Sequence, residues 1–157
     1  MTDPILSTAP LPPPSPVGID PRGPRFSAAV TAALLVVVIL LDDGPAILLI
    51  TVIAAMFALG ALRGAQGTVQ GLLYRRFVRP RLAPPAELED ARPPRFAQLV
   101  GLFITGLGVL LGLFGVPAAV PVAAGLALVA AVLSSAFGLC LGCELYLLGV
   151  RLRGRST

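Results

Sequence analysis

The chain has 157 residues, of which 56% are hydrophobic and only 13% are charged. Soluble domains carry about 25% charged residues, so this composition excludes a water-soluble globule and predicts an integral membrane protein. There is no histidine, and the two cysteines cannot complete a four-ligand zinc site within one chain. We therefore expect no metal and no cofactor, with a zinc site shared across a dimer as the open alternative, and no nucleic-acid partner.

The first half of the chain combines a polar tail with two apolar stretches. Residues 1–19 are rich in proline, which predicts a disordered tail that buries nothing. Apolar stretches at about 26–41 and 46–62 predict two transmembrane helices, joined by an Asp-Asp-Gly-Pro turn. Residues 66–81 place apolar side chains on one side and arginines elsewhere, which predicts an amphipathic helix at the membrane interface.

The second half repeats this order after a linker at 82–89. Apolar stretches at about 96–116 and 118–139 predict two further transmembrane helices, with a Gly-Val-Pro turn between them. The glycines of the third stretch favour tight helix packing and a homo-oligomer. No ionisable residue lies deep within any of the four stretches, which argues against an ion-coupled transporter.

Two motifs recur at a nearly constant distance. The pattern Asp-x-Arg-x-Pro-Arg-Phe occurs at 20–26 and again at 90–96, and a Leu-Tyr…Val-Arg-x-Arg pattern occurs at 73–81 and again at 145–153. We therefore predict an all-α membrane protein whose four transmembrane helices form two tandem helical-hairpin repeats, 20–81 and 90–157, with interfacial amphipathic helices. Both copies begin on the same side, so an axis along the membrane normal should relate them.

Arginine supplies all twelve basic residues, and none lies in either predicted hairpin turn. By the positive-inside rule, both termini and the central connector are predicted to be cytoplasmic. The use of arginine alone suggests a GC-rich bacterial genome, so we expect a multi-pass protein of a bacterial plasma membrane. The repeated motifs hold Arg22, Arg25, Arg92 and Arg95, which we interpret as anchors at lipid headgroups or partners of nearby aspartates.

Both cysteines lie at the end of the last apolar stretch, in a Cys-x-x-Cys pattern. When the second motif of the repeat is superposed on its first occurrence, Cys140 and Cys143 correspond to Thr68 and Gly71. This correspondence predicts that the pair lies at or just beneath the cytoplasmic interface. Glu144 suits that depth, because a carboxylate at the membrane centre would be costly.

Two interpretations of the cysteine pair remain open. One helical turn separates the cysteines, so they share a face, although a disulfide in the middle of a regular helix would be strained. Flanking glycines loosen the helix there and also suit close helix packing, in which cysteine is simply a small apolar residue. The functional interpretation is a reactive dithiol that cycles between thiol and disulfide.

Four segments together resemble a known family. They are residues 18–26, 78–81, 92–98 and the Phe-Gly-Leu-Cys-Leu-Gly-Cys-Glu sequence at 137–144. The combination resembles the domain of unknown function 4395 family, mostly from actinobacteria, over about residues 18–153. The resemblance implies a small multi-span membrane protein with a Cys-x-x-Cys pair near its end, often encoded beside thioredoxin-like proteins and rhodanese-type sulfurtransferases.

The expected function follows from the pair and the resemblance together. We expect thiol-disulfide or sulfur-relay handling, with Cys140 and Cys143 as the catalytic residues and a thioredoxin-like or sulfurtransferase partner in the cytosol. Whether the protein is an enzyme stays open. The alternatives are a non-catalytic scaffold that recruits cytosolic proteins through the connector and tail, and a small sulfur-compound permease.

Overall fold

The computed structural model describes residues 18–85 and 87–154. Most of the predicted tail, residues 1–17, lies outside these ranges. The last residue assigned to the tail belongs to the fold: Ile19 is buried and exchanges two backbone hydrogen bonds with Glu89, each 2.9 Å long. The end of the linker therefore runs antiparallel to the chain that leads into the first helix.

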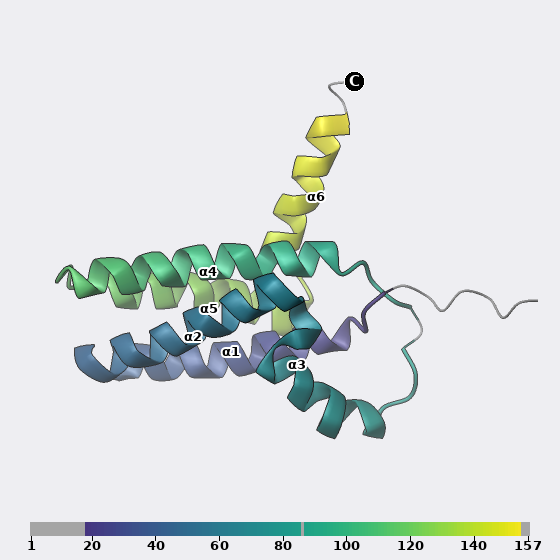
Figure 1. The fold of residues 1–157 in the computed structure, drawn as a ribbon, viewed down its shortest axis with the longest axis horizontal. Coiled ribbons are helices and arrows are strands. Elements are labelled where there is room, and N and C mark those ends of the chain that lie inside the picture. The colour runs from purple at the N-terminus through teal and green to yellow at the C-terminus, as the bar shows by residue number, and fades with distance from the viewer. Residues whose placement is uncertain (1–17, 86, 155–157) are drawn as a thin grey trace, which may run out of the picture.

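Four long helices form a bundle (Figure 1). They are α1 (Arg22–Leu40), α2 (Asp43–Arg63), α4 (Arg92–Leu113) and α5 (Ala119–Phe137). All four are long and apolar enough to cross a membrane, which confirms the predicted all-α membrane fold. The α1–α2 and α4–α5 turns lie together at one end of the bundle, and the arginine-rich segments lie at the other.

Helices α1 and α4 begin several residues before the apolar stretches themselves. Asp20 Oδ1 accepts the backbone N–H of Arg22 at 3.0 Å, and Asp90 Oδ1 accepts that of Arg92 at 2.9 Å. These carboxylates accept hydrogen bonds from N–H groups at the helix start, which have no partner inside the helix. A proline in the first turn fits the same place, because its missing N–H would have had no partner there.

The two hairpins pack against each other, each helix of one against a helix of the other. Helix α1 packs most extensively against α5, and α2 packs against α4 to almost the same extent. These two contacts are equivalent under the sequence repeat. The shared core places Leu35, Ile50 and Ile53 against the alanine surface of α5, including Ala124 and Ala127. Most other large apolar side chains point outward, as helices surrounded by lipid require.

Equivalent aromatic contacts connect each hairpin to the segment that follows it. The rings of Phe26 and Tyr74 lie 5.8 Å apart, and those of Phe96 and Tyr146 are separated by the same 5.8 Å. Each pair holds the segment after the hairpin against the N-terminal part of that hairpin's first helix. The two halves therefore share local contacts as well as sequence.

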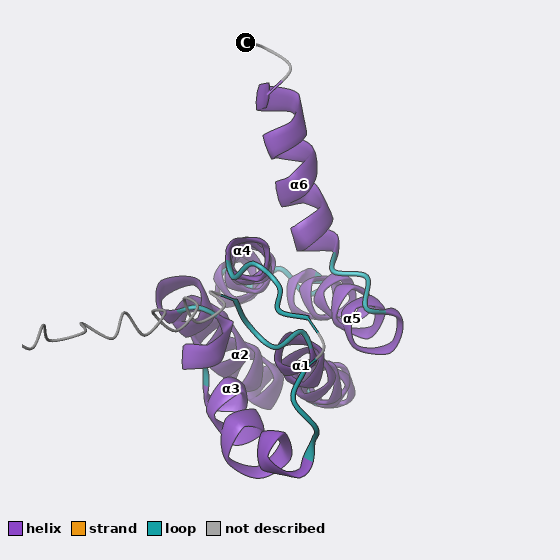
Figure 2. Cartoon of the chain, turned by 90° about the vertical axis from the view of Figure 1, so that its right-hand side faces the viewer, coloured by secondary structure: helices purple, strands orange, loops and turns teal. Residues whose placement is uncertain are grey.

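The segments after the two hairpins differ in course. After α2, the chain forms η1 (Ala65–Gly67), α3 (Val69–Leu73), η2 (Tyr74–Val78) and η3 (Arg79–Arg81), and its first part packs against α1. After α5, a single helix, α6 (Leu141–Gly154), contacts α4 near its start and then leaves the bundle sideways (Figures 1 and 2). The final helix of the second copy therefore projects away from the bundle beyond its contact with α4.

Candidate functional site

A break between α5 and α6 sets the position of the cysteine pair. Gly138 has a φ of 69°, in the left-handed region that favours glycine, and it ends α5 after Phe137. The fourth span was predicted to run to about residue 139, with the cysteine pair directly after it. In the structure α5 ends at Phe137, the chain turns at Gly138, and Cys140 immediately precedes the new helix α6.

Cys140 lies at the N-terminal cap of α6. Its carbonyl oxygen accepts the N–H of Glu144 at 3.0 Å, and its Sγ accepts the N–H of Cys143 at 3.4 Å. The two cysteines are joined as a disulfide, with their Cα atoms 5.1 Å apart. Both residues are partly exposed. The bridge does not lie in the middle of a helix, because Cys140 precedes the first residue of α6.

The first repeat has the same cap in a different element. Thr68 precedes α3, and its Oγ1 accepts the N–H of Gly71 at 3.0 Å. The sequence repeat, which aligns Thr68 with Cys140 and Gly71 with Cys143, therefore maps one capping hydrogen bond onto the other. A sulfur atom in the second copy stands where a hydroxyl caps the helix in the first.

This position has a chemical consequence when the pair is reduced. Helix N-termini carry partial positive charge and N–H groups without a partner in the helix, and both favour a thiolate over a thiol. The Arg25 guanidinium packs directly against Gly138, so a permanent positive charge lies beside the chain break. Glu144 opposes this effect, but it is exposed to solvent screening.

The arginines of the repeated motifs, predicted as headgroup anchors or partners of aspartates, differ in the protein contacts that they make. Arg95 donates from Nε to the carbonyl oxygen of Ala61 at 2.6 Å and from Nη2 to that of Leu62 at 3.1 Å. It thus binds the last turn of α2, whose carbonyl groups have no partner in the helix. Arg22 donates to the carbonyl oxygen of Ala83 at 3.1 Å, and Arg92 is exposed.

A second polar contact joins the segment after α2 to the residues just before α1. Tyr74 is only 4% exposed, and its hydroxyl donates to Asp20 Oδ2 at 3.0 Å. Burial raises the pKa of the Tyr74 hydroxyl above its ordinary 10.0, and the hydrogen bond to Asp20 raises it further. This pair locks the segment after α2 to the start of α1.

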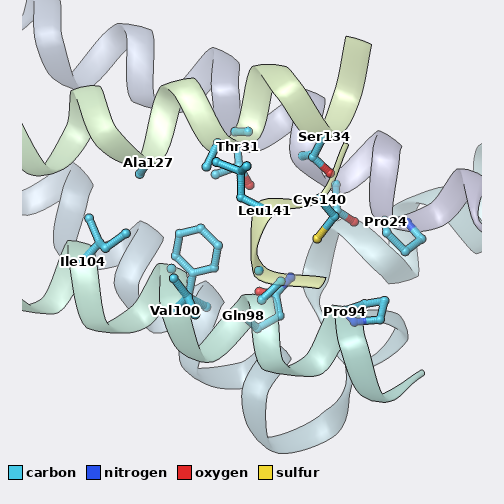
Figure 3. Close-up of a pocket in the computed structure, with 18 of the residues that line it drawn as sticks. Pro24, Thr31, Pro94, Gln98, Val100, Ile104, Ala127, Ser134, Cys140 and Leu141 are labelled. Atoms are coloured by element: carbon cyan, nitrogen blue, oxygen red, sulfur yellow. The ribbon is translucent and has the colours of Figure 1, made fainter. Parts of the chain in front are cut away.

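A cavity of about 420 Å³ opens beside Cys140. Figure 3 shows the Cys140 sulfur directed into it, with Gln98 and Pro94 on α4 across the space and Ser134 on α5 nearby. Cys140 is the only cysteine among its lining residues, and within the described part of the chain none of those residues is charged. Sequence reasoning missed this cavity, because its walls come from separate helices.

One hydroxyl at this cavity lacks a hydrogen-bond partner. Ser27 is 7% exposed, and its Oγ is the buried side-chain oxygen without a partner in the described ranges. Beside it, Gln70 Nε2 donates to Thr31 Oγ1 at 3.2 Å. Residues 18–85 and 87–154 contain no group of three or more side chains that could hold a metal ion.

The four apolar helices and the paired hairpins define a helical membrane protein with a cysteine pair at one end of its bundle. The chain belongs to the family described as "Domain of unknown function (DUF4395)", whose model matches residues 19–151. No match was found among curated proteins. No solved structure matches the chain either.

Proposed function

We propose that the protein handles thiol-disulfide or sulfur transfer at the membrane, exchanging through Cys140 and Cys143 with a thioredoxin-like or rhodanese-type partner. The observation that supports this most directly is the capping position of Cys140, whose Sγ accepts a backbone N–H at a helix N-terminus. Such positions favour the thiolate, which is the nucleophile in disulfide exchange. Packing alone would not require the sulfur at the cap.

The reaction uses the two cysteines in order. The Cys140 thiolate attacks one sulfur of a partner disulfide, a new S–S bond forms, and the partner's other sulfur leaves as a thiolate. The Cys143 thiol then loses its proton and attacks Cys140 Sγ. The intramolecular disulfide forms, and the partner is released as a dithiol after it takes up the two protons.

A partner persulfide fits the same chemistry. Attack of the Cys140 thiolate on the outer sulfur of that persulfide transfers this sulfur to Cys140 and releases the partner thiolate. Attack of Cys143 on Cys140 Sγ then releases hydrosulfide and forms the same disulfide. The two branches differ in one product, since only sulfur transfer liberates sulfide.

The proposed location is a bacterial plasma membrane, with both chain termini in the cytoplasm. The arginines gather at the end of the bundle where α6 begins, and the positive-inside rule assigns that end to the cytoplasm. A cytosolic partner would then reach the partly exposed pair from the aqueous side. The cytosol is reducing, so the disulfide is an intermediate of a cycle rather than a structural crosslink.

The test traps the mixed disulfide in inverted membrane vesicles. The variant Cys143→Ser keeps the attacking thiol and lacks the resolving one, so it should accumulate a covalent complex that dithiothreitol releases. The control Cys140→Thr places at the cap the residue that Thr68 already supplies in the first repeat. It should fold normally and trap nothing.

Mass spectrometry of the trapped complex identifies the partner, and sulfide release distinguishes sulfur transfer from disulfide exchange. A membrane-impermeant maleimide should label the reduced wild-type pair without detergent. If neither the wild type nor Cys143→Ser is labelled or trapped until detergent is added, the pair is buried packing and the proposal is wrong.

A further inference from the structure

The cavity beside Cys140 has a composition that selects its ligand. It is lined by α1, α2, α4 and α5, together with Gln70 of α3 and the start of α6. It extends from Pro94, in the first turn of α4, to Ile104 near the middle of that helix. Figure 3 shows both residues along the same wall. A ligand here is surrounded by membrane-spanning helices, so it is a molecule that partitions into the bilayer.

The residues that line the cavity indicate the charge of its ligand. The walls are mainly apolar, and a buried ion without a partner of opposite charge would be costly. No charged side chain lines the cavity within the described residues, which argues against sulfite, thiosulfate or another anion. The ligand is therefore neutral. The volume of about 420 Å³ falls within the range of small-molecule sites.

Polar groups on three helices specify the ligand further. The amide of Gln98 lies across from Cys140, Ser134 contributes a hydroxyl from α5, and the buried hydroxyl of Ser27 on α1 has no partner. Amides and hydroxyls can donate to carbonyl oxygens. Phe57 provides an aromatic ring at the same cavity. A flat ring that carries carbonyl oxygens matches these groups.

Cys140 adds the chemical requirement. Its sulfur faces the cavity, and its disulfide partner Cys143 is 5.1 Å away between Cα atoms, so the ligand lies beside a two-electron couple. A neutral, lipid-soluble ring with carbonyl oxygens that accepts two electrons is a quinone. We propose that this cavity binds a membrane quinone that oxidises the Cys140–Cys143 dithiol. This inference rests on the proposed redox function of the pair.

The step balances in atoms and electrons. The Cys140 thiolate adds to a ring carbon of the quinone, and an S–C bond forms. The Cys143 thiolate then attacks Cys140 Sγ, so that the S–S bond forms and the S–C bond breaks, with its electron pair passing to the ring. The two protons of the original thiols complete the hydroquinone. The pair loses two electrons and the quinone gains them.

The repeat explains why only the second copy places a cysteine at the cavity. The equivalent of Cys140 is Thr68, and Gln70, which bonds to Thr31, stands where the second copy has Gly142. In the first copy, the Gln70 side chain contacts α1 through this hydrogen bond. The glycine places α6 directly on Ala97, which leaves Cys140 at the cavity edge.

The experiment uses the full chain in nanodiscs, reduced and freed of reductant, and mixed with menadione without oxygen. We expect one menadione reduced per cysteine pair, with the disulfide formed at the same rate, and no turnover with Cys140→Thr. The variant Ala130→Phe fills the cavity from α5 and should slow the reaction about tenfold or more. Val132→Phe is the matched control, because Val132 is exposed on the same helix and does not line the cavity.

A water-soluble aromatic disulfide measures intrinsic thiol reactivity in the same samples. Its rate should be equal in Ala130→Phe and Val132→Phe, and Ala130→Leu replaces the phenylalanine variant if that protein does not fold. Equal menadione rates in the cavity variant and its control would overturn the quinone site. Failure of the partner-trapping experiment alone would refute the exchange with a cytosolic protein and leave the quinone reaction standing.

Discussion

The contact between α6 and α4 provides a direct test of how the cysteine pair is positioned. Gly142 lies between the two cysteines and is buried against α4. A Cβ added at this residue would lie 2.5 Å from the Ala97 Cα atom and 2.6 Å from its Cβ atom. Real Cβ contacts are essentially never under 3.0 Å, so the variant Gly142→Ala must shift α6 away from α4.

The size of the effect follows from two opposing terms. Replacing glycine by alanine within a helix stabilises it by about 0.5–1 kcal/mol. Overpacking a close contact costs about 1–3 kcal/mol, and here the nearest atom belongs to the backbone, which no change of rotamer can move away. Gly149 lies on the same helix with nothing within 4 Å of an added Cβ. Gly149→Ala should therefore gain the helix stabilisation by alanine without the cost of overpacking.

Hydrogen exchange of the α6 amides measures the docking of that helix. Gly142→Ala should raise the exchange rates of the first turns of α6, by about tenfold for each 1.4 kcal/mol lost. Gly149→Ala should lower them slightly. With reduced protein, the menadione rate should fall in Gly142→Ala and stay at the wild-type value in Gly149→Ala, because only the first variant displaces Cys140 from the cavity.

The reasoning is refuted if the α6 amides exchange at equal rates in the two alanine variants. That outcome would mean that α6 moves freely on α4 and that Gly142 does not hold it. A third result, faster exchange in Gly142→Ala with an unchanged menadione rate, would separate the two claims. Docking of α6 would then depend on Gly142, and the quinone reaction would not require that docking.

Two further predictions concern the arginine-rich end. Arg95→Gln removes two hydrogen bonds to the last turn of α2 and should lower the free energy of unfolding in mixed micelles by about 1–2 kcal/mol. Arg92 is also exposed but has no such bond to α2 among the described contacts, so Arg92→Gln should change the free energy of unfolding little. Equal losses in the two variants would contradict the assigned contacts. In Tyr146→Phe, the remaining tyrosine should ionise with a pKa above 10.0 by absorbance, and adding Asp20→Asn should lower that pKa. Because the folded pKa of Tyr74 is raised, its contribution to stability is fully present below pH 10 and is lost as the pH rises through that pKa.

The sequence by itself determined the class of the protein, the four spans and the correspondence of the two copies. Composition and apolar length carry these conclusions, because hydrocarbon requires every backbone group to be bonded within a helix. The repeat also pairs Cys140 with Thr68, and in the structure each of them caps the helix that follows. That prediction needed only local sequence, since a helix cap is a contact between residues close together in the chain.

Only the tertiary structure decided where α5 ends and what Cys140 faces. The sequence around Gly138 is compatible with either a continuous helix or a left-handed turn, and the packing of Gly142 on Ala97 and of Arg25 on Gly138 accompanies the turn. The cavity is likewise invisible in the sequence, because residues from both halves of the chain line it. Each span reads as apolar on its own, and their few polar side chains form a site only once four helices bring them to one space beside the Cys140 sulfur.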